Sequence, residues 1–442
     1  MKRRTFLSQT TKPMIGLSAA MLAGNPRQVL GANDKIRIGL VGCGGRGLML
    51  FRAYSRDERF QFAYMCDPDP RRGAREFEWA KAEHNPHIKR YTDFRRMLDD
   101  KNVDMVMIAT PDHWHALATI LACQAEKDVY VEKPMSHNLV EGRKMIEAAR
   151  KYNRVVQVGM QSRSAPYLYE AAEYIRSGKL GDIQLCKIFN MKSDRPFHAD
   201  ETLQPPKELN LDVWLGAARE KYAYVYASKG WLFYWDFCNG DMMNDGVHQI
   251  DIARWLLNQR FPKSAYCTGG NFAFDDDREV PDTQCAVLEF DNQIVTIENT
   301  QNMQYMQKTT LDMRNRSEFP LWQHNATRIE IYGSKGLMMV GRHGSGWQVF
   351  SKDGQVVAEA HGQFPDEPHK DNLYECLHSR KRANADVEEG HISCAWVHLA
   401  NISLKLGGRK LVFDAASEKC DVPEANALLQ RQYRKPYQLP TI

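Results

Sequence analysis

The sequence predicts an α/β plus α+β fold: an N-terminal doubly wound parallel sheet, then an open, mostly antiparallel sheet with helices on one face. Three observations carry this prediction. Short apolar strands alternate with helical segments up to about residue 159, a glycine-rich loop follows the first strand, and strand-like stretches dominate from about residue 182. Strands that alternate with helices form parallel sheets, whereas runs of strands with few crossing helices form antiparallel ones.

The first part follows element by element from its apolar periodicity. Residues 36–41, IRIGLV, form the first expected strand, a helix is expected from 46 to 55, and FQFAYMC (60–66) is the second strand. The alternation then continues, with helices at about 71–84, 92–99, 113–125 and 138–152 and strands at 103–109, 128–132 and 154–159. In such sheets, ligands bind beyond the carboxyl ends of the strands.

The segment GCGGRG after the first strand fits the pattern G-x-G-x-x-G at Gly42, Gly44 and Gly47, with Gly45 and Arg46 between them. Glycines there allow a tight turn, close approach of the backbone to a pyrophosphate, and packing of the helix on the strand. The N–H groups at the helix start then hold the phosphates. Because the loop lies between a predicted strand and a predicted helix, it predicts a Rossmann dinucleotide site.

Asp67 ends the second strand, 25 residues after Gly42. An acid at this place accepts hydrogen bonds from the adenosine ribose and repels a 2′-phosphate, which favours NAD over NADP. Arg71 and Arg72 follow closely and are able to bind a 2′-phosphate, so NADP stays possible. The alternative role of Asp67 is a cap on the next helix.

Three polar loops leave the carboxyl ends of later strands: TPDHWH at 110–115, EKP at 132–134 and MQSRS at 160–164. We expect them to line the ligand crevice. The residues expected to contact the cofactor are Thr110, Pro111, His115, Glu132 and Lys133, and Arg163 is expected to contact substrate. A solvated surface lysine is the alternative for Lys133.

The second part has strand-like stretches at 182–191, 263–273, 283–290, 294–301, 327–333, 336–341 and 346–351. Between them a helix is expected from Gly246 to Leu257, capped by Asn244 or Asp245. His248, in its first turn, is a candidate acid or base. A hydrogen-bonded core histidine is the alternative. Aromatic residues are dense from 214 to 235, which suits either sugar-stacking walls or ordinary interdomain packing.

Composition limits the other possibilities. Lys and Arg number 59 against 55 Asp and Glu, with no long basic run, which argues against nucleic acid as the main partner. The ten cysteines are scattered without zinc spacing, so no metal is expected.

The chain starts MKRRTFL, and twin arginines before Phe-Leu resemble a Tat export signal, which predicts a periplasmic protein without stable membrane insertion. The expected divisions are an export segment at 1–33, a nucleotide-binding domain at 34–158 and a substrate-binding and oligomerisation domain at 159–442.

Together, the glycine-rich loop, ATPDHWH, EKP and the pattern D-G-x-H-x-x-D resemble the Gfo/Idh/MocA oxidoreductase family. The segments at 369–391 and YRKPYQLP resemble its Tat-exported bacterial branch, with glucose–fructose oxidoreductase and inositol dehydrogenase as related members. The resemblance implies a nicotinamide cofactor bound between a Rossmann domain and an open-sheet domain that dimerises. It also implies that Lys133 contacts substrate and nicotinamide and that His248 moves the hydroxyl proton.

One position departs from the family pattern. Many members carry an Asp four residues before the histidine, where this chain has Asn244, and the acid is shifted to Asp245. We expect Lys133, His248 and Asp245 to be catalytic, and Arg163, Asn244, Asp245 and His248 to contact substrate.

The resemblance implies an NAD(P)-dependent oxidoreductase that transfers hydride from a hydroxyl of a sugar, sugar derivative or cyclitol, in a homodimer or homotetramer. A glycoside-cleaving enzyme that recycles tightly bound NAD is the alternative. It ranks lower because the N-acetylgalactosaminidases of this kind look different at EKP. A non-catalytic sugar-binding protein is a third possibility, against which the intact Gly42, Lys133 and His248 argue.

Overall fold

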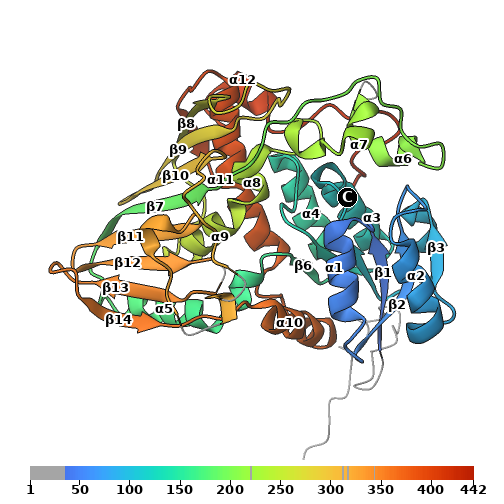
Figure 1. Cartoon of the computed structure of the whole chain (residues 1–442), viewed down its shortest axis with the longest axis horizontal. Coiled ribbons are helices and arrows are strands. Elements are labelled where there is room, and N and C mark those ends of the chain that lie inside the picture. The colour runs from blue at the N-terminus through green and yellow to red at the C-terminus, as the bar shows by residue number, and fades with distance from the viewer. Residues whose placement is uncertain (1–34, 220–221, 311–312, 316–317, 343) are drawn as a thin grey trace, which may run out of the picture. The chain divides into compact units, whose positions relative to one another are not determined.

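Six parallel strands form the first sheet of the computed structural model, in the order β3-β2-β1-β4-β5-β6 (Figure 1). Their bounds are β1 Ile36–Val41, β2 Phe60–Cys66, β3 Lys89–Tyr91, β4 Met105–Ile108, β5 Asp128–Val131 and β6 Val156–Val158. Every residue of β4, β5 and β6 is buried, as in parallel strands covered on both faces. The strand order reverses between β1 and β4, and a doubly wound sheet opens its ligand crevice at that point.

The structure describes residues 35–219, 222–310, 313–315, 318–342 and 344–442. Lys35–Ile442 forms one compact unit. The expected export segment, residues 1–33, lies outside the described residues. No helix in the described part of the chain is long and apolar enough to cross a membrane.

The first sheet's helices agree with the sequence where the apolar pattern is long. They are α1 Gly45–Tyr54, α2 Ala74–Trp79, α3 His115–Gln124 and α4 Leu139–Lys151. α4 begins at Asn138, whose side chain accepts a hydrogen bond from the Glu141 N–H at 2.9 Å. The helix expected over 71–84 continues beyond α2 only as a wider π turn, Ala80–His84. The helix expected over 92–99 is a single 3-10 turn, Phe94–Met97, because a segment this short forms few backbone hydrogen bonds.

Ten strands form the second sheet, in the order β14-β13-β12-β11-β7-β10-β9-β8-β15-β16. Only the pair β7–β10 is parallel among these neighbours, so the expected mostly antiparallel sheet is confirmed. The bounds are β7 Ile183–Met191, β8 Ser264–Gly270, β9 Thr283–Glu289, β10 Ile294–Thr300, β11 Arg328–Gly333, β12 Gly336–Gly341, β13 Trp347–Phe350, β14 Val356–Ala360, β15 Leu411–Asp414 and β16 Lys419–Cys420.

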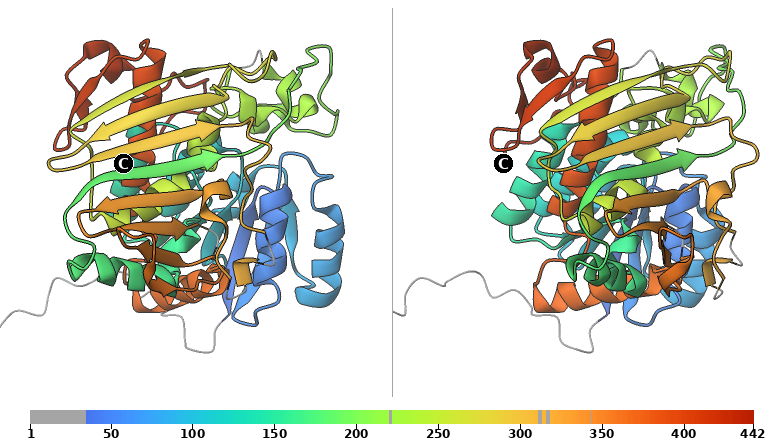
Figure 2. Two further views of the ribbon diagram at one scale, coloured as in Figure 1. Left: turned by 60° about the vertical axis from the view of Figure 1, so that its left-hand side comes forward. Right: turned by 90° about the vertical axis from the view of Figure 1, so that its left-hand side faces the viewer.

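Helices cover one face of this sheet (Figure 1). The helices of the second part are α5 Pro166–Arg176, α8 Gly240–Asn244, α9 Val247–Leu256, α10 Asp366–Ser379, α11 Val387–Lys405 and α12 Pro423–Ala427. Val295 and Ile297 of β10 are buried against the helices, whereas Ile294 points to the opposite face and is 44% exposed. Figure 2 turns that opposite face toward the viewer.

A segment between β7 and α8 carries two short helices, α6 Leu211–Leu215 and α7 Tyr224–Ser228, and the turn Trp231–Phe233. We call residues 192–239 the insert. It has its own aromatic core, in which Tyr222, Tyr234 and Phe237 are buried. The backbone N–H of Asn210 donates to the carbonyl of Pro68 at 2.9 Å, so the insert contacts the loop that follows β2.

Candidate active site

A cavity of about 540 Å³ lies at the carboxyl ends of β1, β2, β4 and β5. It is bounded on its other sides by the insert and by the start of α9. Twelve of the residues expected at the site from the sequence line it: Gly42, Gly44, Gly45, Arg46, Asp67, Thr110, Pro111, His115, Glu132, Lys133, Asn244 and His248. Gly47, Arg163 and Asp245 are not among its lining residues.

The glycine-rich loop fits a pyrophosphate. A Cβ on Gly44 or Gly45 would meet nothing within 4 Å, so the backbone N–H groups at the start of α1 face open space. Gly42 has φ +92°, and a Cβ there would lie 2.6 Å from the carbonyl oxygen of Ala109. At Gly47 a Cβ would lie 1.9 Å from the carbonyl of Gly42, so Gly47 permits helix–strand packing without lining the cavity. These are the separate roles that glycines play in a dinucleotide loop.

Asp67 is buried at the other end of this loop. Its carboxylate accepts hydrogen bonds from the backbone N–H of Cys43 at 2.8 Å and of Asp69 at 2.9 Å. Burial raises the pKa of Asp67 to about 6, although these two N–H donors oppose the shift. Asp67 therefore anchors the loop after β1 and lines the cavity where a ribose would lie. The helix cap considered as its alternative role is not formed, since α2 begins seven residues later.

Arg71 and Arg72, the two arginines near Asp67 that were considered for binding a 2′-phosphate, differ in whether they line the cavity. Arg71 is paired with Asp69 at 2.8 Å and is directed to the surface. Arg72 lines the cavity, and its Nε donates to the hydroxyl of Tyr226 at 3.0 Å. The guanidinium groups are thus held by the protein's own oxygens, and the acid at position 67 fits the ribose of NAD.

Glu132 and Arg46 form a buried pair between β5 and the first turn of α1. The Arg46 Nε donates to Glu132 at 2.7 Å, and the hydroxyl of Tyr130 donates to the same oxygen at 3.1 Å. Burial would raise the pKa of Glu132, but Arg46 and Lys133 outweigh it and hold the pKa below its ordinary value. A Cβ on Gly159 would lie 2.9 Å from the Glu132 carboxylate, so glycine there makes room for this group.

Lys133 reaches from the end of β5 to α8. Its ammonium donates to the backbone carbonyl of Asn244 and to the Asn244 Oδ1 at 3.2 Å. The lysine is therefore held in the cavity wall beside the second part of the chain rather than solvated on the surface.

His115 connects two of the loops that line the cavity. Its Nδ1 lies 2.6 Å from the carbonyl oxygen of Pro134 and its Nε2 lies 3.0 Å from that of Thr110. Burial lowers the pKa of His115, which favours the neutral ring. Because both nitrogens face backbone carbonyls, His115 is a positioning residue that holds the EKP loop against the loop after β4.

His248 lies in the first turn of α9, as expected, and lines the cavity. The expected cap by Asn244 or Asp245 is wrong, because Asn244 is the last residue of α8 and Gly246 precedes α9 without a side-chain cap. A Cβ on Gly246 would lie 2.5 Å from the carbonyl of Met242. Glycine thus allows the sharp junction that brings Asn244 and His248 to the same cavity wall.

Asp245 does not suit the catalytic role expected for it. Lys308 and Arg342 both contact its carboxylate, the latter at 2.6 Å, and Lys192 lies 3.9 Å away. Burial would raise the pKa of Asp245, but these three cations hold it well below the ordinary value. The carboxylate stays ionised at neutral pH and is not part of the cavity lining, which does not favour the expected role as a proton relay.

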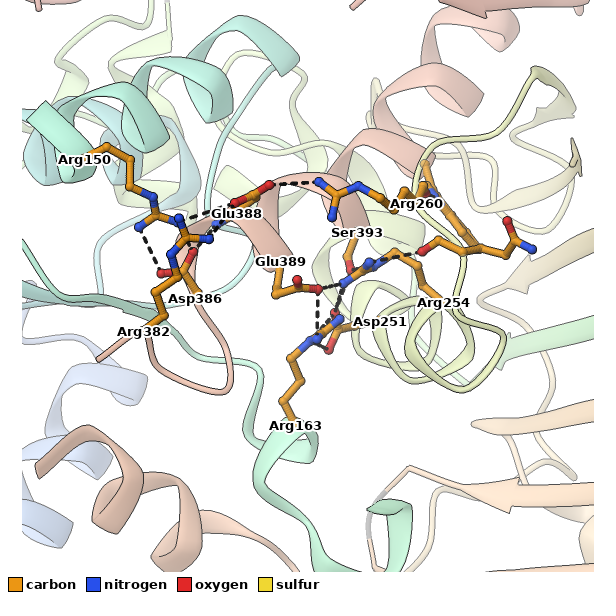
Figure 3. Close-up of polar contacts among 12 residues, drawn as sticks. Arg150, Arg163, Asp251, Arg254, Arg260, Arg382, Asp386, Glu388, Glu389 and Ser393 are labelled. Carbon is orange, nitrogen blue, oxygen red and sulfur yellow. Dashed lines mark hydrogen bonds and ion pairs between the residues drawn. The ribbon is translucent and has the colours of Figure 1, made fainter. Parts of the chain in front are cut away.

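Arg163 does not reach the cavity, contrary to the expected substrate contact. Its Nε lies 2.9 Å from both oxygens of Asp251, and its Nη1 lies 2.9 Å from Glu389 (Figure 3). Ser393 donates to Asp251 at 2.6 Å and accepts from Arg254 at 2.9 Å. This buried network joins the segment after β6 to α9 and α11, so Arg163 supports the helix that carries His248.

Asp112 is a cavity residue that the sequence reasoning missed. It is 2% exposed, and its Oδ2 has no hydrogen-bond partner among the described residues. Burial raises the pKa of Asp112 to about 7, although Lys133 opposes the shift. The only available signal was its place in the TPDHWH loop. Arg342 is another lining residue that was missed, whereas Gln161 and Ser162 lie in the MQSRS loop that was expected to line the crevice.

Three family models match the chain. An oxidoreductase family model with an NAD-binding Rossmann fold matches residues 36–160. The GFO/IDH/MocA C-terminal domain matches 212–339, and an oxidoreductase family C-terminal alpha/beta domain matches 330–439. An uncharacterized oxidoreductase of Bacillus subtilis is 25% identical over 304 residues, which are 68% of this chain and 72% of the relative.

An inositol 2-dehydrogenase of Rubrobacter xylanophilus is 26% identical over 245 residues, 55% of this chain and 58% of that relative, so the match spans less than two thirds of its length. Among solved structures, the WlbA dehydrogenase from Bordetella pertussis, in complex with NADH and UDP-GlcNAcA, gives a TM-score of 0.62 at 23% identity, covering 86% of this chain and 99% of that one. An aldose–aldose oxidoreductase from Caulobacter crescentus gives 0.63 at 18% identity, covering 86% and 100%. At these identities the two structures share the fold.

Proposed function

Since the chain belongs to the Gfo/Idh/MocA oxidoreductase family, we propose that it oxidises a hydroxyl group of a sugar, sugar derivative or cyclitol and transfers the hydride to NAD. One observation carries the proposal: a single cavity has the glycine-rich loop and Asp67 at one end and Lys133 and His248 at the other. Relatives named inositol 2-dehydrogenase and levoglucosan dehydrogenase support the substrate class.

Different residues of the protein bind the cofactor, accept the proton and stabilise the developing charge. The loop at Gly44 and Gly45 and the carboxylate of Asp67 hold the dinucleotide, which supplies the hydride acceptor when bound. The imidazole of His248 takes the proton from the substrate hydroxyl. Lys133 places a positive charge beside that hydroxyl and favours its deprotonation. Asn244 orients Lys133 and is able to hydrogen-bond the substrate, but an amide carries no proton onward.

The test is direct. Purified full-length protein is denatured and any released nucleotide is identified by mass. Absorbance of reduced nicotinamide is followed in the intact protein while neutral and acidic sugars, cyclitols and glycosides are added with NAD. Steady reduction with one of these compounds supports the proposal. A protein that binds NAD and oxidises no member of the panel contradicts it.

The insert favours a second candidate function, in which NAD stays bound and is restored within each cycle. Val225, Lys229 and Trp231 of the insert line the cavity. The hydroxyl of Tyr226 donates to Asp69, and Arg72 donates to the same hydroxyl at 3.0 Å. The nucleotide then leaves only if these contacts open. A transient reduction that returns to NAD, with cleavage of an added glycoside, would favour this glycoside-cleaving function.

Export is part of the proposal and rests on the sequence alone. Arg3 and Arg4 before Phe6 and Leu7 support a Tat signal, and this route carries proteins that have folded around their cofactor. An exported enzyme has no free NAD pool, so export also favours a retained cofactor. Fractionation of cells that express the chain tests the periplasmic location, with Arg3→Lys, Arg4→Lys as the variant that should stay in the cytoplasm.

Homo-oligomerisation through the second sheet is supported by an apolar row on its helix-free face. The register pairs Ile294 with Leu185, Leu185 with Tyr332, Tyr332 with Leu337, and Leu337 with Phe350. The row thus crosses five neighbouring strands without a charge, and such rows mark interaction surfaces. Sedimentation of the wild type should give a dimer or tetramer, and Leu337→Glu should shift it toward the monomer.

A further inference from the structure

Positive charge exceeds negative charge around Asp245, which follows the cavity residue Asn244. The cluster comprises three cations and two carboxylates: Lys192, Lys308 and Arg342, with Asp241 and Asp245. A buried excess of like charge is costly unless an opposite charge joins it.

The two carboxylates of the cluster are already engaged. Asp241 contacts Lys192 and accepts from the amide of Asn190 at 2.8 Å. Asp245 contacts Lys308 and Arg342. Neither carboxylate is available to neutralise a further cation, so the excess charge of the cluster reaches the cavity through Arg342, which lines it.

Arg342 lines the cavity, and the hydrogen bonds that it makes with described residues use only one of its three nitrogens. Its Nη1 donates to the Asp245 carboxylate at 2.6 Å, to the Asp245 carbonyl at 3.3 Å and to Gln249 at 3.3 Å. Its Nε and Nη2 have no hydrogen-bond partner within the described ranges, although only 9% of the side chain is exposed. Nε and Nη2 of a guanidinium form parallel donors that match the two oxygens of a carboxylate.

We propose that the substrate is an acidic sugar, whose carboxylate is bound by the Nε and Nη2 of Arg342 while its hydroxyl faces His248. This inference rests on the proposed function and narrows its substrate class. A phosphate ester offers the same oxyanion chemistry, and the experiment below separates it from a carboxylate. The reaction itself is unchanged: a C–H hydride leaves the sugar, the hydroxyl proton goes to His248, and the acid group keeps its charge throughout.

The first test compares ligands on unaltered protein. Trp214 and Trp231 line the cavity, so tryptophan fluorescence of the full-length protein loaded with NADH reports binding without turnover. Glucuronate, its neutral methyl ester, glucose and glucose 6-phosphate are titrated in turn. We expect glucuronate to bind at least about tenfold more tightly than its ester, as removal of a charge-assisted pair predicts. Equal affinity of acid and ester overturns the proposal, and tighter binding of the phosphate identifies the oxyanion as phosphate and overturns the carboxylate.

The second test changes the arginine. Arg342→Gln should abolish the preference for acid over ester, and Arg342→Lys should keep part of it, because the charge remains and the fork is lost. Arg176→Gln, on an exposed arginine of α5 whose side chain is 60% exposed, is the matched control and should keep the full preference. A preference that survives in Arg342→Gln overturns the role of Arg342. Oxidation of neutral sugars without any acid preference removes this inference but leaves the proposed function intact.

Discussion

The ammonium of Lys133 lies 3.2 Å from the side-chain oxygen of Asn244 and also donates to the Asn244 backbone carbonyl. One residue follows β5 of the first sheet and the other ends α8, which leads into the helix of His248. This contact therefore fixes the position of the lysine relative to the histidine. It places both groups in the wall of the cavity that begins at the glycine-rich loop.

Replacement of either group should remove turnover and spare the fold. We expect Lys133→Met and His248→Ala each to lower kcat by about 10²- to 10⁴-fold, the usual contribution of a positioned acid, base or charge. Initial rates with the best substrate of the panel measure the effect. Lys101→Met, on an exposed lysine, is the control for Lys133. NAD affinity and melting temperature should stay close to wild type, and normal turnover in either variant would withdraw the role of that residue.

Arg163 should affect stability rather than substrate affinity. Arg163→Met removes the guanidinium that pairs with Asp251, which is 1% exposed and keeps only its contacts with Ser393 and Arg254 among the described residues, and loss of one member of a buried pair costs up to about 3–5 kcal/mol. Denaturant unfolding measures the loss. The exposed Arg382 pairs with Glu388 instead, and Arg382→Met should cost no more than about 1 kcal/mol. A raised KM with unchanged stability in Arg163→Met would restore the substrate contact expected from the sequence.

Tyr226 should govern how fast the nucleotide leaves. Tyr226→Phe keeps the ring but removes the hydroxyl that joins Asp69 to Arg72, so the insert should open more often. A hydrogen bond to a charged group contributes about 1.5–3 kcal/mol, which corresponds to at least about tenfold faster release of bound NADH. Stopped-flow displacement by excess NAD measures the rate. Tyr224→Phe, on the same helix but outside these contacts, should release NADH like wild type, and equal rates in both variants would exclude the insert as the barrier.

The fold was predictable from the sequence wherever apolar periodicity was long. All seven strands expected in the second part appear as β7–β13, whereas β3, β14, β15 and β16 were missed. β3 is the three-residue edge strand KRY, which has no apolar alternation, and its pairing with β2 depends on tertiary contact. The aromatic residues of the insert were expected either to line a sugar site or to pack between domains. Trp214, Tyr226 and Trp231 line the cavity, whereas Tyr222 and Tyr234 pack in the core of the insert.

The sequence predicted those parts of the candidate site that are formed by residues close to one another in the chain. The glycine loop works through its own backbone, so the spacing alone located it. Asp245 and Arg163 were assigned wrongly to the cavity because their partners are distant in sequence: Arg342 lies 97 residues from Asp245, and Asp251 lies 88 residues from Arg163. Asp112 was missed because its unusual pKa comes from burial, which no motif records.

Asp112 should make the stability of the protein depend on pH around neutrality. Burial raises its pKa from the ordinary 3.8 to about 7 in the folded protein. Between these values the folded state binds more protons than the unfolded state, so the carboxyl's contribution to stability is present at low pH and is lost as pH rises through about 7. Asp112→Asn is nearly the same size and cannot ionise. We therefore expect its free energy of unfolding, relative to wild type, to rise with pH.

The size of the pKa shift of Asp112 sets the expected difference in the free energy of unfolding between the variant and the wild type. Each unit of pKa shift corresponds to about 1.4 kcal/mol, and about two units of the shift lie above pH 5, so the variant should gain about 3 kcal/mol over wild type between about pH 5 and about pH 9. Denaturant unfolding of both proteins across this range measures it. Lys133 opposes the shift, so the same comparison in a Lys133→Met background should give a larger gain. A stability difference that does not change with pH would mean that Asp112 ionises normally in the folded protein, and its place as a titrating group of the cavity would be withdrawn.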